Sequence, residues 1–113
     1  MSEAFVWFHH SSNKPADSVG FYRSLLGWAP TDGPPGMTMF AGEAGPFAGV
    51  GDAPEADIVG WLPYVQVDHV DTATQKAESL GATLVKPKTR GPAGEYTIVR
   101  DPGGAAIALW QKA

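Results

Sequence analysis

A repeated order of predicted elements constrains the fold of this 113-residue chain more than any other feature. Two β-rich segments, Phe5–Ser11 and Trp61–Val67, each come before a stretch with helical periodicity. Gly27 and Gly81 follow these stretches, 54 residues apart, and suit the left-handed residue that commonly ends a helix. One such unit cannot bury both its helix and its sheet, so two units must pack together.

Each half is expected to follow its helix with three further strands. The first helix should run from about Lys14 to Leu26, and the second over about 69–80 with Asp68 as its cap. The strands are expected at 5–11, early in 28–36, 37–41, 47–51, 61–67, 83–86 and twice within 94–110, with a loop at 87–93. The chain is therefore one domain of two βαβββ modules, about 5–51 and 61–111, with an acidic linker at 52–60.

The last hairpin indicates what the two faces of the second sheet are made of. A turn at Asp101–Gly104 joins its strands, because proline presets φ for a turn and glycine accepts a positive φ. After the turn, Ile107 and Leu109 suit packing on a helix. The alternate positions carry small side chains and Trp110, which is typical of a cavity lining.

Composition excludes several classes of function. The net charge is −4 and the eight Lys and Arg residues are scattered, which argues against a nucleic-acid-binding surface. Apolar runs stay well short of the ~20 residues of a membrane span, and no signal pattern opens the chain, so we expect a cytoplasmic protein without membrane contact. With no cysteine, thiolate chemistry and disulfides are excluded.

Four short motifs, in order along nearly the whole chain, carry a resemblance to a known family. They are Phe21–Trp28, Val65–Asp68, Leu80–Ala82 and Asp101–Gly104. Together they resemble the vicinal oxygen chelate superfamily, which includes glyoxalases, bleomycin-resistance proteins and extradiol dioxygenases. The resemblance implies an α+β fold in which two βαβββ modules form a curved mixed sheet around a central cup, usually within a homodimer.

In metal-dependent members of this superfamily, four strand positions supply imidazole or carboxylate ligands to a divalent ion. The resemblance maps three of these positions onto Trp7, Leu62 and Ala108, and the fourth onto the segment 46–51. None of the residues there carries a metal-binding side chain. We therefore expect neither a metal ion nor another cofactor.

Strand alternation then predicts which side chains face the cup. If Trp7 does so, the expected lining consists of Trp7, His9, Tyr64, Gln66 and Trp110, with Phe47 as a further candidate. The alternative is that these rings fill the core or a dimer interface. His9 could contact ligand, act as a base or be a core histidine. His10 is expected on the helix side or the surface, His69 in solvent, and Glu95 at the cup rim or an exposed edge.

Three functions remain open at this level. The first is a metal-free protein that binds a small, planar, largely apolar molecule. The second is a lyase, isomerase or dioxygenase-type enzyme that uses His9 with Glu95 or Gln66, or an unplaced metal site. The third is an interaction module with a filled cup.

Overall fold

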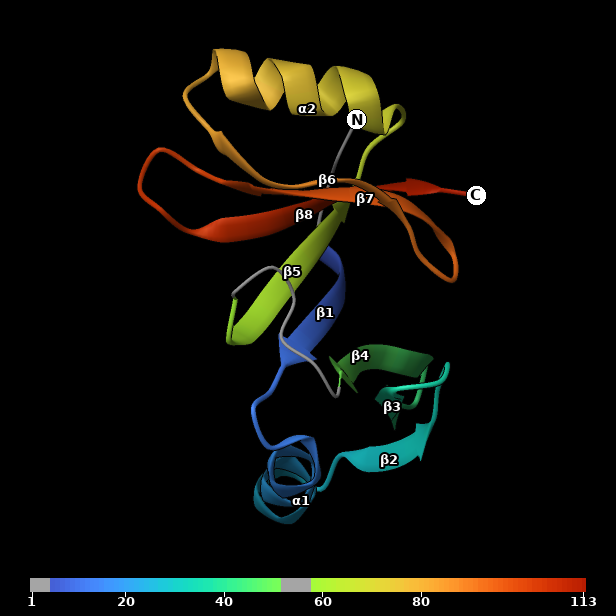
Figure 1. Cartoon of the computed structure of the whole chain (residues 1–113). Helices are drawn as coiled ribbons and strands as arrows, with labels where there is room; N and C mark the ends of the chain where they lie inside the picture. The colour runs from blue at the N-terminus through green and yellow to red at the C-terminus, as the bar shows by residue number, and fades with distance from the viewer. Residues whose placement is uncertain (1–4, 52–57) are drawn as a thin grey trace. The chain divides into compact units, whose positions relative to one another are not determined.

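The computed structural model describes residues 5–51 and 58–113, which form two helices and eight strands. The expected α+β fold with two βαβββ repeats is confirmed (Figure 1). The chain divides into two compact units. Residues 7–62 form the N-terminal unit, and residues 63–113 with Phe5 and Val6 form the C-terminal unit.

The N-terminal unit contains one helix and a sheet in the order β2-β3-β4-β1. Strand β1 is parallel to β4, whereas the β2–β3 and β3–β4 pairs are antiparallel. Its elements are β1 (Phe5–Ser11), α1 (Pro15–Leu26), β2 (Ala29–Asp32), β3 (Met37–Gly42) and β4 (Gly45–Gly51).

Helix α1 begins and ends as expected. Pro15 takes the first helical position, where its missing N–H removes nothing from the helix. Gly27 adopts the left-handed conformation with φ of 71°, and its N–H donates to the carbonyl of Arg23 at 2.9 Å. Among the described residues of α1 none is fully buried, so the helix contributes to the core through partly buried side chains such as Val19 and Tyr22.

The core of the N-terminal unit is rich in aromatic rings. Phe40, Ala48 and Val50 are almost completely buried at its centre. Five partly buried side chains pack against them: Val19, Tyr22, Trp28, Phe47 and Trp61. The Trp61 indole N–H donates to the Tyr22 hydroxyl at 3.0 Å, so the helix is held by a hydrogen bond as well as by ring contacts.

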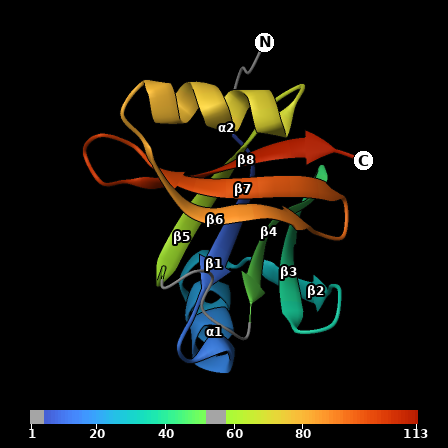
Figure 2. The same ribbon diagram turned by 45° about the horizontal axis from the view of Figure 1, so that its top comes forward.

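The C-terminal unit repeats this plan with a sheet in the order β5-β8-β7-β6. Strand β5 is parallel to β8, and the β8–β7 and β7–β6 pairs are antiparallel. Helix α2 lies along the sheet of β6, β7 and β8 (Figure 2). The elements are β5 (Gly60–Gln66), α2 (Val70–Ser79), β6 (Thr83–Arg90), β7 (Gly94–Arg100) and β8 (Ala106–Lys112).

Between α2 and its sheet lies an aliphatic core, centred on Val70, Val99 and Leu109. A buried polar contact crosses it, because the hydroxyl groups of Thr74 and Thr97 lie 2.8 Å apart. Thr74 also donates to the carbonyl of Val70 at 2.6 Å, so Thr97 is the donor between the two threonines.

The expected cap of α2 is wrong by one residue. His69 rather than Asp68 occupies the capping position, in an extended conformation. The first helical N–H, that of Val70, donates instead to the side-chain oxygen of Gln111 at 2.9 Å. This partner comes from β8, 41 residues away in sequence, so a local capping pattern could not predict it.

Strand β6 is longer than expected, because residues 87–90 belong to it rather than to a loop. Pro87 is tolerated because β6 is the outer strand of this unit's sheet and the pairing register shifts between Lys86 and Thr89. Most of the expected linker, residues 52–57, lies outside the described residues, and Gly60 already begins β5.

Gly94 provides a test of close packing in the C-terminal unit. It is buried, and a Cβ atom there would overlap the carbonyl oxygen of Gln111 and lie 2.8 Å from Trp110 Nε1. Gly94→Ala should therefore lower the free energy of unfolding by about 2 kcal/mol, as overpacking does. Urea denaturation measures this change.

Gly20→Ala is the matched control, because a Cβ at this exposed position of α1 meets no described atom within 4 Å. It should raise the free energy of unfolding by about 1 kcal/mol through helix propensity. Equal stability of Gly94→Ala and the wild type would contradict the packing described here.

Candidate ligand-binding site

One face of the C-terminal sheet carries most of the predicted lining. Tyr64 lies opposite Ala108, and Gln66 lies opposite Trp110, in the β5–β8 pair. Trp110 in turn lies opposite Tyr96 of β7. Because paired residues project to the same side of a sheet, all of these side chains share one face. We call it the aromatic face; its members are Tyr64, Gln66, Tyr96, Ile98, Ala108 and Trp110.

The aromatic face has an apolar floor with rings packed around it. Ile98 and Ala108 have no exposed surface. The rings of Tyr64 and Tyr96 lie 5.6 Å apart at an interplanar angle of 44°. Tyr64 and Trp110 are half-buried, and Gln66 is exposed. The face therefore offers flat apolar surface beside an accessible amide.

A lysine that the sequence analysis did not select lies on the same face. Lys86 of β6 pairs with Ile98, and its ammonium group donates to the Tyr96 hydroxyl at 2.9 Å. The same nitrogen lies 5.1 Å from the centre of the Tyr96 ring. Because side chains alternate along β7, Tyr96 could have been assigned to the same face as Ile98 from the sequence. The orientation of Lys86 could not, because the pairing register shifts on both sides of it.

Trp7 and His9 share a face of the N-terminal sheet, as alternation predicts. Their neighbours on β1, Phe8 and His10, pair with the core residues Ala48 and Val50. His9 is 7% exposed and lies opposite Gly49. A Cβ atom at Gly49 would lie 3.0 Å from the Trp7 ring, so this glycine makes room for the indole.

Phe47 lies elsewhere, and its inclusion in the lining was wrong. Its ring packs edge-on against Trp28, at 5.0 Å between centroids, within the core cluster of Phe40 and Ala48. The cause is a register shift between Phe40 and Ala41, which gives β4 an extra residue and re-aims its side chain.

Three other residues that the sequence brought into question, Glu95, His69 and His10, are not part of the aromatic face. Glu95 alternates with Tyr96 and so shares the opposite face with Thr97, which contacts α2. His69 is exposed at the start of α2, as expected. His10 is on the helix side, where it forms edge contacts with Tyr22 and Trp61.

The positions that hold metal in metal-dependent relatives do not fit a metal ion here. Leu62 and Ala108 are fully buried apolar residues, and Trp7 offers an indole N–H, which donates and does not ligate. Across the described ranges 5–51 and 58–113, no group of three His, Asp or Glu side chains is arranged to hold an ion. In the same ranges, no helix is long and apolar enough to cross a membrane.

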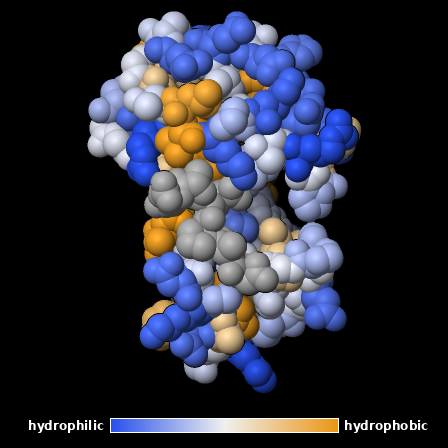
Figure 3. Space-filling model, in the orientation of Figure 1, coloured by the Kyte–Doolittle hydropathy of each residue, from blue (hydrophilic) through white to orange (hydrophobic). Residues whose placement is uncertain are grey.

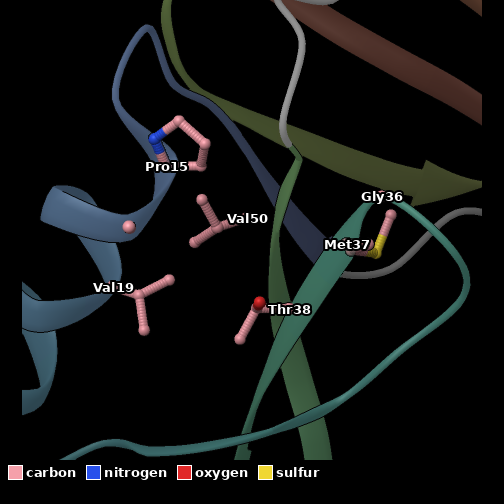
Figure 4. A pocket seen from close by; sticks show the side chains of 7 residues that line it. Pro15, Val19, Gly36, Met37, Thr38 and Val50 are labelled. Atoms are coloured by element: carbon pink, nitrogen blue, oxygen red, sulfur yellow. The ribbon is translucent and has the colours of Figure 1, made fainter.

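A separate cavity of about 530 Å³ lies in the N-terminal unit, between the first turns of α1 and strands β3 and β4 (Figure 4). The side chains that line it are apolar apart from the Thr38 hydroxyl, as seen in Pro15, Val19 and Val50. Apolar side chains also remain on the surface, including Phe21 and Leu25 of α1, at 57% and 62% exposure. The orange areas of Figure 3 show that hydrophobic residues reach the surface of the molecule among hydrophilic ones.

His10 has an unusual electrostatic environment. Its Nδ1 atom is buried without a hydrogen-bond partner among the described residues, and 8% of the residue is exposed. Burial lowers the pKa of the imidazole below its ordinary value of 6.5, although its own backbone acts in the opposite direction. The neutral ring is therefore the form that the folded state favours.

This pKa shift predicts an acid-sensitive stability. Below about pH 6.5 the unfolded chain binds a proton at His10 more readily than the folded chain, so the free energy of unfolding should fall as the pH falls from 7 to 5. His10→Phe keeps an aromatic ring but cannot titrate, and its stability should fall less over this range.

Urea denaturation of both proteins at each pH provides the measurement. The interpretation fails if His10→Phe shows the same pH dependence as the wild type.

Comparison with known proteins places the chain in a family. A family model described as a glyoxalase-like domain matches residues 7–110. "Putative glyoxylase CFP32" of Mycobacterium tuberculosis is 32% identical over 93% of this chain and 44% of its own length. "Anthracycline biosynthesis protein DnrV" of Streptomyces peucetius is 29% identical over 95% of this chain and 46% of its own. The chain thus spans less than half the length of these relatives.

Solved structures share the fold at lower identity. The Mn(II)-bound glyoxalase from Novosphingobium aromaticivorans has a TM-score of 0.64 at 15% identity, covering 98% of this chain and 40% of the other. Methylmalonyl-CoA epimerase from Mycobacterium tuberculosis has a TM-score of 0.63 at 18% identity, covering 96% and 87%. Membership in the vicinal oxygen chelate superfamily is confirmed, and the chain belongs to its glyoxalase-like domain family.

Proposed function

We propose that this glyoxalase-like protein binds a small, planar, largely apolar molecule without a metal ion. The observation that carries the proposal is the aromatic face, where Tyr64, Tyr96 and Trp110 surround a fully buried floor. Flat apolar walls with few polar groups are typical of small-molecule sites. Trp7 and His9 share a face of the N-terminal sheet, and their role in ligand binding stays a prediction from the sequence.

The aromatic contacts and buried apolar area that this face offers are sufficient for a ligand of modest affinity. An aromatic pair contributes about 0.5–1.5 kcal/mol beyond the burial of its area. Two or three such contacts, added to buried apolar area, are compatible with micromolar binding, about 8 kcal/mol. Gln66 offers both a donor and an acceptor, so it can bond a carbonyl or ring nitrogen at the ligand's edge.

The likeness to the anthracycline biosynthesis protein supports a planar ligand. Anthracyclines are built on fused flat rings, and the chain shares 29% identity with that relative over 95% of its own length. The enzyme alternative cannot use Glu95 on the aromatic face, because Glu95 lies on the α2 side of β7. The homodimer and the cytoplasmic location stay predictions.

Replacing the indole of the aromatic face should weaken binding. We expect Trp110→Ala to raise the Kd of a planar ring compound at least tenfold, because the ligand loses a wall. The assay is quenching of the fluorescence of the four tryptophans by a library of planar metabolites and antibiotics, repeated by calorimetry for each compound that binds.

Leu84→Ala is the control, since Leu84 lies opposite Val99 and thus on the other face of the sheet. Its Kd should stay within about twofold of the wild type. If Trp110→Ala unfolds the protein, or if it folds and binds as tightly as the wild type, the ring is structural and the proposal is wrong.

The metal content of the purified protein tests the part of the proposal that excludes a metal ion. Since Trp7, Leu62 and Ala108 supply no ligand, the purified protein should carry well under one equivalent of zinc, nickel, iron or manganese. Chelators should leave both its Tm and the Kd for a planar ligand unchanged. One tightly bound equivalent by elemental analysis would contradict the metal-free function.

A further inference from the structure

The cavity of the N-terminal unit is separate from the aromatic face, since the residues that line it all come from α1, β3, β4 and the turn before β3. Its volume of about 530 Å³ is within the range of small-molecule sites, about 300–1,000 Å³. In Figure 4, Pro15 and Val19 lie on the α1 side of this cavity. Thr38 and Val50 form the opposite side, and because they pair, their side chains project to the same face of the sheet.

The packing of α1 explains why this space is open. Near the end of the helix, Tyr22 stacks on Trp28 at 5.5 Å, and Trp28 packs edge-on against Phe40 at 5.4 Å. One turn earlier, the helix presents Val19 to the cavity, and before that Ala16, whose side chain is a single methyl group. The rings hold the helix at a distance from the sheet that side chains this small cannot fill.

Thr38 supplies the polar group of the cavity. It is half-buried, and within residues 5–51 and 58–113 its hydroxyl makes no hydrogen bond. The hydroxyl groups of Ser12 and Ser18, near the start of α1, are by contrast paired with each other at 2.6 Å. A ligand oxygen at Thr38 would replace water there and keep the hydroxyl hydrogen-bonded.

The charge of the lining determines which ligands suit the cavity. The described residues that form its walls carry no charged side chain. The positive end of α1 already has a carboxylate in its first turn, that of Asp17. An ionised ligand would therefore lose water without gaining a partner of opposite charge, which is unfavourable.

We propose that this cavity binds a small, neutral aliphatic molecule with one oxygen function, an alcohol or a ketone, whose oxygen bonds to the Thr38 hydroxyl. Its carbon chain lies against Val19 and Val50, beneath the first turns of α1. The lining contains no aromatic ring among the described residues, so this ligand class differs from the planar rings proposed for the aromatic face. The site is a second one and does not depend on the proposed function.

The test follows the backbone amide signals of the isotopically labelled protein by NMR at pH 7 during titration with 1-hexanol. The shifts should saturate and should be largest at Ala16, Val19 and Thr38. From 1-butanol to 1-hexanol the affinity should rise about fourfold per methylene, as expected when each methylene is buried. Hexanoate, which is ionised at this pH, should bind at least tenfold more weakly than 1-hexanol.

Two variants examine the two sides of the cavity. Thr38→Val keeps the shape of the side chain and removes the hydroxyl, so it should weaken 1-hexanol binding about fivefold. Thr31→Val, on the neighbouring strand β2 and outside the cavity, is its matched control and should stay within about twofold of the wild type. Ala16→Phe should fill the cavity and abolish binding, whereas Ser24→Phe, at an exposed position of α1 outside the cavity, should leave it unchanged.

Several outcomes would overturn the proposal. They are shifts that rise without saturating, shifts centred on Tyr64 and Trp110 instead, equal affinity for 1-hexanol and hexanoate, and binding that Thr38→Val leaves unchanged. If the signals of Val19 and Thr38 depend on protein concentration without added ligand, a second copy of the chain covers the cavity and the proposal is wrong. Because the planar library is assayed separately, failure here leaves the function proposed for the aromatic face standing, and the reverse also holds.

Discussion

Each unit has one helix, and that helix can cover only one face of the unit's sheet. This constraint determines which side chains pack in the core under the helix and which project to the other face. Side chains alternate across a strand, so covering one face with a helix leaves the other to be covered by different means. In the C-terminal unit, Val99 and Leu109 pack under α2, whereas Ile98 and Ala108 project to the opposite face. The helix covers only one face of the sheet, and Ile98 and Ala108 are fully buried on the other face without contact from α2.

The N-terminal unit attaches its helix in another way. Among the described residues of α1 none is fully buried, and exposed Leu25 shows that its apolar stripe only partly faces the sheet. The helix is held chiefly by the Tyr22 ring, which touches His10 and accepts a hydrogen bond from Trp61. Because the rings of Tyr22 and Trp61 pack against His10, its Nδ1 atom has no hydrogen-bond partner among the described residues, and protonation is disfavoured.

Periodic features of the sequence predicted the fold well, and irregular features account for the errors. Both helices and the facing of the central strands follow from spacings of 3.6 and 2 residues, so the shared face of Tyr64, Gln66 and Trp110 was predicted correctly. A register shift changes the face to which the following side chains point, and no feature of the sequence marks its position. Shifts of this kind re-aim Phe47 into the core and hide the orientation of Lys86.

Long-range partners were equally beyond prediction. Asp68 had the right chemistry and position for a cap, yet the side chain that bonds the first N–H of α2 is Gln111. Nothing local to either residue encodes this pairing, since it depends on β8 lying beside the start of the helix.

The replacement of metal ligands by apolar residues changes what the C-terminal face can do chemically. A divalent ion binds two ligand oxygens at fixed angles and polarises both, which suits a reaction. This face has instead an ammonium group that donates to the Tyr96 hydroxyl, beside rings that supply flat apolar surface. With Ala108 in the floor and Lys86 at the outer strand, the charge also lies at the border of the face rather than at its centre. This distribution places the rings in the middle of the face and the charge at one side, so flat apolar surface is what the centre of the face offers.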